Sequence, residues 1–231
     1  MGRFSCLLAS VSAIKTNVKS SQLKSTPLYF STQIYHEKLM PRGQKLNRLI
    51  KDVKTEAFQI EAMDDVGYTW SLTNYKNGYT SYSSQDQLHK LSSTFSGLES
   101  KIRRHVQKYL ERLDYQANVD DLVMTDFWVN IMYPNTIHTA HIHPHSVISG
   151  TFYVSTPKGC SGIKFEDPRL GFFMNSPEVK PGARLYNQRF LELKPQAGDI
   201  ALFESWLRHE VPLNSSKEPR ISVSFNYGWK K

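Results

Sequence analysis

The chain has 231 residues, of which 39% are hydrophobic and 22% are charged, as is typical of a single soluble domain. Its two cysteines, Cys6 and Cys160, are too few for a disulfide scaffold or a Cys-rich zinc site. The net charge of +8 includes no dense basic stripe, so we do not expect a nucleic-acid-binding protein. No stretch is apolar for long enough to span a bilayer, so we expect no membrane segment.

Residues 1–25 differ in composition from the rest of the chain. They are rich in Ser and Thr and contain no Asp or Glu. This composition fits an organellar transit peptide, and it fits a disordered leader equally well. We therefore expect a flexible basic leader or transit peptide at 1–25, followed by a single domain over 26–231. The expected location is intracellular, in the cytoplasm unless the leader directs import into an organelle.

The first half of this domain is predicted to be mainly helical, over about residues 40–115. Residues 27–35 are rich in aromatic and β-branched side chains, which predicts a first strand. Apolar residues at helical spacing predict helices over 43–62 and 86–114. Aromatic residues among Gly and Asn over 67–82 indicate loops and short strands.

The second half is predicted to be a β-barrel, mainly over residues 120–229. Expected strands cover 122–133, 146–155, 162–166, 184–193, 199–207 and 220–229. Helices followed by strands indicate an α+β fold in which N-terminal helices pack against an antiparallel sandwich or barrel. In the last strand, apolar residues alternate with polar ones, so its polar face is expected to point to solvent or into the barrel. These polar residues are Arg220, Ser222, Ser224 and Asn226.

Four of the eight histidines lie close together between residues 138 and 145. In an extended strand His141 and His143 project from one face and His138 from the other. Two imidazoles at this spacing can bind one metal ion, and a further histidine, His209, follows a late strand. The pattern favours a metal site over a set of hydrogen-bonded core or surface histidines. The candidate ligands are His141, His143 and His209, and the expected non-ligands are His138 and His145.

Several short motifs recur in a characteristic order along the second half of the chain. They are His141-x-His143-Pro144, Ser149-Gly150-x-Phe152-Tyr153-Val154, Phe165-x-Asp167-Pro168-Arg169, Gly198-Asp199, Ser205-Trp206-Leu207-x-His209 and Arg220-x-Ser222. In this order and spacing, residues 120–229 resemble the 2-oxoglutarate/Fe(II)-dependent oxygenase superfamily, in particular a branch with the motif H-x-H-P. The resemblance implies a double-stranded β-helix, which is a jelly-roll, cupin-like barrel.

The resemblance also implies an activity and its cofactors. The protein would be a dioxygenase that uses Fe(II), 2-oxoglutarate and O2. It would hydroxylate a small molecule or a protein side chain and release succinate and CO2. The superfamily's metal ligands fall on His141, His143 and His209.

Four further residues are implied to hold the cosubstrate. Arg220 and Ser222 match the superfamily's partners for the tail carboxylate of 2-oxoglutarate, and an arginine fork is the preferred partner of a carboxylate. Asn130 and Tyr153 are weaker candidates for additional hydrogen bonds to the same molecule.

One position departs from the usual pattern, because His143 stands where the superfamily commonly has Asp or Glu. Glu166 or Asp167 could supply that carboxylate, although their position before Pro168 is typical of a turn. Two other functions stay open. A cupin-type three-His metalloenzyme would not use 2-oxoglutarate and would have no need of Arg220, which could then form a surface salt bridge. A jelly-roll binding protein would have no turnover.

Overall fold

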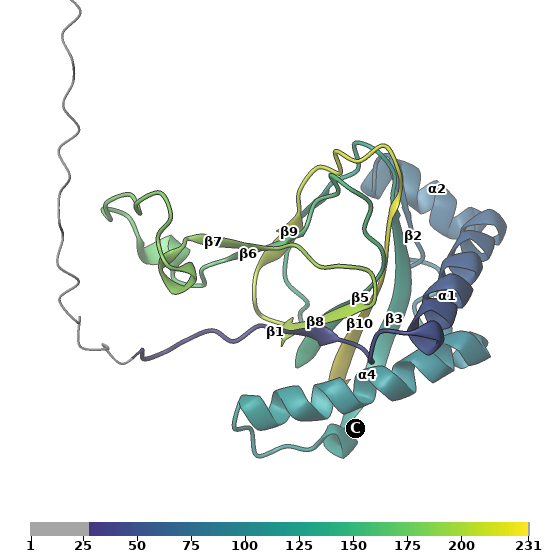
Figure 1. The fold of residues 1–231 in the computed structure, drawn as a ribbon, viewed down its shortest axis with the longest axis horizontal. Coiled ribbons are helices and arrows are strands. Elements are labelled where there is room, and N and C mark those ends of the chain that lie inside the picture. Colours follow the sequence, from purple (N-terminus) through teal and green to yellow (C-terminus); the bar gives the residue numbers. More distant parts are fainter. Residues whose placement is uncertain (1–27, 231) are drawn as a thin grey trace, which may run out of the picture. The chain divides into compact units, whose positions relative to one another are not determined.

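The computed structural model describes residues 28–230, and two antiparallel sheets form the centre of the fold (Figure 1). The larger sheet has the strand order β1-β8-β5-β10-β3-β2, and the smaller sheet has the order β4-β9-β6-β7. Side chains from both sheets line a common cavity. This arrangement is the double-stranded β-helix that the sequence predicts, and with its helices it confirms the α+β class.

The larger sheet consists of β1 (Tyr35–Lys38), β2 (Gly78–Thr80), β3 (Leu122–Met132), β5 (Ile148–Ser155), β8 (Asp199–Glu204) and β10 (Arg220–Trp229). The smaller sheet consists of β4 (His138–His141), β6 (Ile163–Glu166), β7 (Phe190–Leu193) and β9 (His209–Val211). The helices are α1 (Gln44–Met63), α2 (Asp65–Asn74), α3 (Leu88–Leu91) and α4 (Ser93–Arg112). Short 3-10 turns occupy Val119–Asp121, Leu170–Phe172 and Leu185–Asn187.

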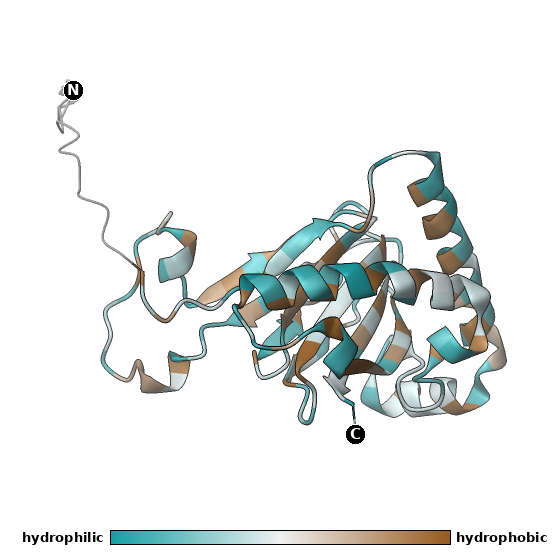
Figure 2. Ribbon diagram, turned by 90° about the horizontal axis from the view of Figure 1, so that it is seen from below, coloured by the Kyte–Doolittle hydropathy of each residue, from teal (hydrophilic) through white to brown (hydrophobic). Residues whose placement is uncertain are grey.

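The main core lies between the larger sheet and the helices. Ile221, Val223 and Phe225 of β10 are fully buried there, together with Phe95 and Ile102 of α4. Figure 2 shows α4 running across the strands, with hydrophilic residues on much of its outer side. The helices thus cover one face of the larger sheet, and its other face is left to line the barrel. None of the helices in 28–230 is long and apolar enough to cross a membrane.

The helical half differs from the prediction in two places. Loops and short strands were expected over 67–82, but residues 65–74 form α2, whose first turn is capped by the Asp64 side chain, which accepts from the backbone N–H of Gly67. This helix buries only Gly67 and Ser71 and so has no apolar stripe to reveal it. The helix predicted over 86–114 is interrupted at Ser92, which is extended and caps α4 through its hydroxyl.

Two predicted strands also have different bounds. The first strand begins at Tyr35, because β1 pairs only with the four residues of β8 from Asp199 to Leu202. The strand predicted over 184–193 is confined to β7, and a 3-10 turn precedes it. The leader predicted at 1–25 lies outside the described residues.

The chain changes sheets between β8 and β9, and this change positions the last histidine. The strand predicted over 199–207 ends at Glu204 in the larger sheet. After a short turn, β9 starts at His209 in the smaller sheet, where His209 is paired with His141 of β4. Two histidines that are far apart in sequence therefore lie side by side across an antiparallel pair.

Candidate active site

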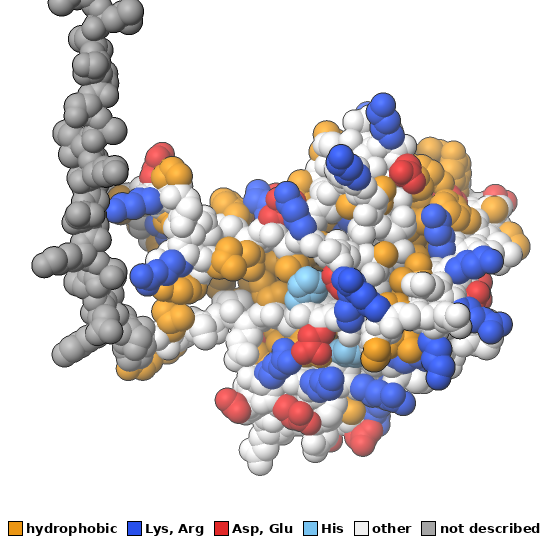
Figure 3. All heavy atoms as spheres, viewed as in Figure 1, with side chains coloured by type: hydrophobic (Ala, Val, Ile, Leu, Met, Phe, Trp, Pro, Cys, Tyr) orange, Lys and Arg blue, Asp and Glu red, His pale blue; other side chains and the backbone are white. Residues whose placement is uncertain are grey.

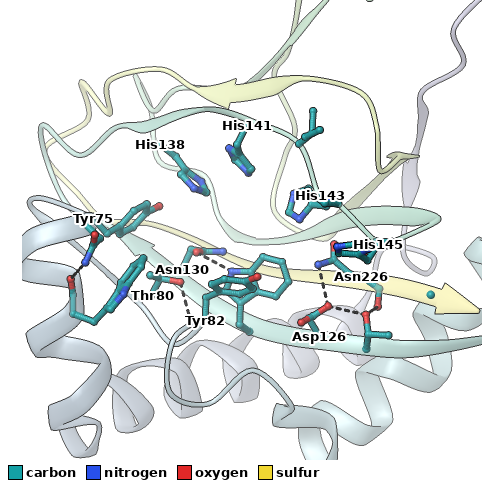
Figure 4. Close-up of a pocket in the computed structure, with 18 of the residues that line it drawn as sticks. Tyr75, Thr80, Tyr82, Asp126, Asn130, His138, His141, His143, His145 and Asn226 are labelled. Atoms are coloured by element: carbon teal, nitrogen blue, oxygen red, sulfur yellow. Dashed lines mark hydrogen bonds between the residues drawn. The ribbon is translucent and has the colours of Figure 1, made fainter.

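Three imidazoles converge inside the barrel. One side-chain nitrogen from each of His141, His143 and His209 lies within 4.8 Å of the other two. The Nε2 atoms of His143 and His209 are 3.3 Å apart. Figure 4 shows His141 and His143 above the strand that carries Asn130 and Asp126. The three residues predicted as metal ligands are thus brought together by the fold.

The turn after β4 determines where His143 lies. The backbone N–H of His143 donates to the carbonyl oxygen of Ser205, at 3.0 Å. Two residues later, His145 adopts the left-handed conformation, with φ of 69°. Such a value is uncommon for a residue other than glycine, although histidine tolerates it better than most. The turn places His143 against the His141–His209 pair and sends the chain on into β5.

Backbone carbonyls set the tautomers of two of these imidazoles. The Nδ1 atom of His141 lies 2.7 Å from the Thr139 carbonyl oxygen, and the Nδ1 atom of His209 lies 2.9 Å from the Leu207 carbonyl oxygen. Because a carbonyl can only accept, we assign the proton to Nδ1 in both rings. Their Nε2 lone pairs are then free to bind a metal ion, as in many metal sites whose ligands are held by outer hydrogen bonds.

The electrostatics of the cluster favour neutral imidazoles. Burial, together with the neighbouring His141, lowers the pKa of His143 to about 4 and that of His209 to about 2. Burial also lowers the pKa of His141. Metals bind the neutral ring, so the described residues present three ligands in the form that a divalent cation requires.

His138 lies closer to this cluster than the sequence predicts. The β4–β9 pairing is irregular between His138 and His141, so simple alternation fails and the prediction that they face opposite sides is wrong. The two rings are 4.3 Å apart between centroids, and His138 also packs edge-on against Tyr75. His138 lines the cavity, but it does not belong to the group of three converging nitrogens.

The two alternative carboxylates have other partners. Glu166 lies 3.4 Å from the Arg208 guanidinium, and Asp167 lies 2.8 Å from that of Arg169. Hydrogen bonding to Arg169 lowers the pKa of the Asp167 carboxyl. Neither residue is part of the converging cluster. Among the described residues, the site is therefore composed of three histidines without a carboxylate.

Arg220 lies deep inside the same cavity that the histidines line. Only 2% of the residue is exposed, which rules out the surface salt bridge considered above. Its Nε donates to the Ser161 carbonyl oxygen at 3.1 Å, and its Nη1 lies 3.4 Å from the Ser222 hydroxyl. No described carboxylate forms an ion pair with it. The barrel thus contains a buried positive charge that has no acidic partner among the described residues.

The other two cosubstrate candidates occupy different positions. Asn130 lines the cavity, where its side chain accepts from the Trp128 indole N–H and donates to the Ser224 hydroxyl. Tyr153 packs in a small core cluster, its ring centroid 5.2 Å from the Arg220 guanidinium carbon. The Tyr153 hydroxyl is buried and has no hydrogen-bond partner among residues 28–230. Asn130 can thus contact a ligand directly, whereas Tyr153 does not line the cavity.

A wider pocket of about 720 Å³ adjoins this inner cavity. Tyr75, Trp128, Asn130 and three of the histidines line both spaces, so the two are adjacent. Tyr75 comes from the aromatic segment 67–82, which the sequence analysis expected to form loops and short strands, and it immediately follows helix α2. A pocket of this size can hold a small organic substrate next to the histidine cluster.

Comparisons with known proteins agree with this geometry. Residues 126–226 match the family model described as "Putative 2OG-Fe(II) oxygenase". No curated protein matches the chain. Among solved structures, the alpha-ketoglutarate-dependent epimerase SnoN from nogalamycin biosynthesis is 14% identical, with a TM-score of 0.59, over 85% of this chain and 78% of SnoN.

Two further structures share the fold. HygX from Streptomyces hygroscopicus, with nickel and 2-oxoglutarate bound, is 12% identical with a TM-score of 0.55, over 86% of this chain and 84% of HygX. A Pseudomonas putida prolyl-4-hydroxylase is 11% identical with a TM-score of 0.56, over 87% of this chain and 95% of the hydroxylase. Because the three structures are only 11–14% identical to this chain in sequence, the similarity shows a shared fold and nothing more.

Fold and family match indicate the same class of enzyme. Residues 126–226 match the model of the putative 2OG-Fe(II) oxygenases, and the solved structures named above share the jelly-roll fold. Fe(II) is the cofactor of that class and 2-oxoglutarate is its cosubstrate. The converging imidazoles fit a metal ion, and the unpaired Arg220 fits a carboxylate.

Proposed function

We propose that this protein hydroxylates a C–H bond of its substrate, with conversion of 2-oxoglutarate and O2 to succinate and CO2. His141, His143 and His209 hold the iron, and Arg220 with Ser222 holds the tail carboxylate of 2-oxoglutarate. One observation carries the proposal. A buried arginine without an acidic partner lines the same cavity as three neutral imidazoles.

The cost of burying Arg220 supports a dicarboxylate ligand. A buried charge without a partner is unfavourable, and a carboxylate that forms two parallel hydrogen bonds with the guanidinium relieves that cost. No described residue supplies such a carboxylate, so a ligand is the natural source. A molecule that binds metal at one end and carries a carboxylate at the other satisfies both parts of the cavity.

Other residues of the protein support the metal ligands and the cosubstrate. Bound iron would supply the site at which O2 reacts with 2-oxoglutarate. The carbonyls of Thr139 and Leu207 hold His141 and His209 in the ligand tautomer. The Ser222 hydroxyl, close to Nη1 of Arg220, provides a second polar group for the same carboxylate.

Arg220 also helps to distinguish the proposed oxygenase from the two alternative functions. A cupin-type three-His enzyme that does not use 2-oxoglutarate has no use for a buried, unpaired arginine. A non-catalytic jelly-roll protein could retain both the metal and 2-oxoglutarate, but it would not release succinate.

The first test is the anaerobic addition of Fe(II) and 2-oxoglutarate to the purified protein. Chelation of iron by the keto acid is expected to produce a visible charge-transfer band, which succinate in place of 2-oxoglutarate should not produce. Admission of O2 should then release succinate. Full iron occupancy without the band would favour the cupin-type enzyme, and a band without succinate release would favour the binding protein.

A further inference from the structure

We propose that the outer pocket recognises a substrate through a positively charged nitrogen, as in a protonated amine. This inference takes the outer pocket as the substrate site and so rests on the proposed function. It depends on two features of the pocket wall, namely several aromatic rings and a single carboxylate, that of Asp126.

Aromatic side chains from separate parts of the chain surround the pocket. Trp70 comes from α2, Tyr82 from the segment after β2, Trp128 from β3 and Trp229 from the end of β10. The rings of Tyr82 and Trp128 are 4.9 Å apart between centroids. Trp70, Tyr82 and Trp229 keep 38%, 46% and 57% of their surface exposed. Exposed aromatic faces that converge on one space attract cations through their electron-rich rings.

Among residues 28–230, Asp126 is the only acidic residue that lines this pocket, and no lysine or arginine of that range lines it. Its Oδ2 accepts hydrogen bonds from the Thr125 hydroxyl at 2.7 Å and from the Asn226 amide at 3.1 Å. Its Oδ1 has no hydrogen-bond partner among the described residues. Figure 4 shows Asp126 beside Asn226, on the opposite side of the pocket from His143. One carboxylate oxygen is therefore available to a ligand.

A row of buried hydrogen bonds holds this carboxylate in place. The Asn226 amide that donates to Asp126 accepts, through its oxygen, from the Ser149 hydroxyl at 2.8 Å. Ser149 in turn lies 2.8 Å from the Ser205 hydroxyl. The row crosses β3, β10 and β5 and ends beyond β8, so Asp126 is supported by the sheet itself. A preorganised charge binds its partner with less loss of side-chain entropy.

The charge of the pocket wall contrasts with that of the whole chain. The protein has a net charge of +8, and Lys and Arg side chains are spread over the face seen in Figure 3. An anionic substrate would find no lysine or arginine among the described residues of the pocket wall, and an uncharged aromatic substrate would leave Asp126 unused. A cation satisfies both the carboxylate and the rings.

The Trp128 ring, which lines both the outer pocket and the inner cavity, places a substrate near the proposed metal site. The Trp128 ring centroid is 6.1 Å from that of His143. A cation held between Asp126 and the aromatic rings would thus bring its neighbouring carbon atoms toward the three histidines. This geometry favours oxidation of a C–H bond close to the charged nitrogen.

The test compares three probes of similar size on the full-length protein. They are benzylamine, which is protonated at neutral pH, uncharged benzyl alcohol and anionic benzoate. Binding is followed by quenching of tryptophan fluorescence, with and without Fe(II) and 2-oxoglutarate under anaerobic conditions. We expect benzylamine to bind about tenfold more tightly than benzyl alcohol, the size of one charge-assisted contact. Benzoate should bind most weakly.

Two variants and a control assign the preference to its residues. Asp126→Asn keeps the shape and should abolish the preference for benzylamine, whereas Tyr82→Leu should reduce it. Glu178→Gln removes the same charge from an exposed position outside the pocket and should leave it unchanged. Equal affinities for benzylamine and benzyl alcohol, or a preference that survives in Asp126→Asn, would overturn the proposal. A missing 2-oxoglutarate band with an intact amine preference would instead count against the proposed function alone.

Discussion

The two faces of the larger sheet are made by alternate residues of the same strands, yet they differ in chemistry. On β10, Ile221, Val223 and Phe225 pack against the helices in an apolar core. Arg220 and Ser222 point the other way, into the barrel, and are as deeply buried. Burial alone therefore does not distinguish residues of the apolar core from residues of the candidate site. The two faces of the sheet are distinguished by what their side chains contact.

The two faces are also expected to contribute differently to the free energy of unfolding. Each large apolar side chain on the helix side contributes about 1.5–3 kcal/mol through burial. On the barrel side, hydrogen bonds largely replace those lost to water, and a buried unpaired charge is unfavourable. The helix side is therefore expected to stabilise the fold. The barrel side is expected to contribute less to the free energy of unfolding, and its polar groups stay available to bind ligands.

The largest effect is expected from the histidines of the barrel side. Replacing His141, His143 or His209 with Ala removes a direct ligand. Iron affinity should therefore fall by more than the roughly 10- to 100-fold that loss of an outer supporting group costs. His138→Ala and His145→Ala should retain iron, because neither ring belongs to the converging group. Elemental analysis after anaerobic loading measures the occupancy. Normal iron in His143→Ala, with loss in Glu166→Ala or Asp167→Ala, would show that a carboxylate completes the site.

The next effect tests the helix side directly. Phe225 is fully buried and packs edge-on against Phe127 and Tyr227. Phe225→Ala should lower the free energy of unfolding of the metal-free protein by about 3–5 kcal/mol.

Its neighbour on the barrel side, Ser224, provides the matched control. Ser224→Ala removes hydrogen bonds to Asn130 and Thr151 and should cost about 1 kcal/mol. Denaturant unfolding monitored by circular dichroism measures both variants. Similar losses in the two would contradict the division between the faces.

The smallest effect concerns pH. Burial holds the pKa of His143 at about 4 and that of His209 at about 2, below the usual value for histidine. The folded protein therefore keeps these rings neutral as the pH falls through 6.5, where free imidazoles become protonated. Iron affinity should change by no more than about twofold between pH 7 and pH 6. A steep loss over that interval, measured by competition with a chelator of known pH dependence, would show that the rings titrate normally.

The sequence predicts the parts of the fold in which side-chain pattern and structure agree. Helix α1 and most strands of the larger sheet show clear periodicity, since each buries one apolar face. Helix α2 could not be predicted this way, because Trp70 and Tyr75 line a pocket instead of joining an apolar stripe.

The sequence predicted the identity of the clustered residues better than it predicted their arrangement. The spacing of His141 and His143 and the presence of His209 were visible in the sequence, and the fold brings these three together. Alternation along a strand gave the wrong side for His138, because the β4–β9 pairing is irregular at that point. The role of Asp126 could not be predicted either, since its exposed oxygen depends on a hydrogen-bonded row that crosses several strands.

We propose that Arg220, on the barrel side, binds the tail carboxylate of 2-oxoglutarate. Arg220→Leu should weaken 2-oxoglutarate binding by about 2–5 kcal/mol, or roughly thirty- to several-thousand-fold. Iron occupancy should stay near that of the unmodified protein. The metal-free variant should be no less stable, because an unpaired buried charge has been removed. Arg220→Lys should fall between the two, since it keeps the charge and loses the planar fork.

An anaerobic titration of the iron-loaded proteins with 2-oxoglutarate, followed by the charge-transfer band, decides the question. Arg104→Leu, on an exposed position of α4, serves as the matched control. We expect a large loss of 2-oxoglutarate affinity in Arg220→Leu and none in Arg104→Leu. Unchanged affinity in a folded, iron-loaded Arg220→Leu protein would contradict it.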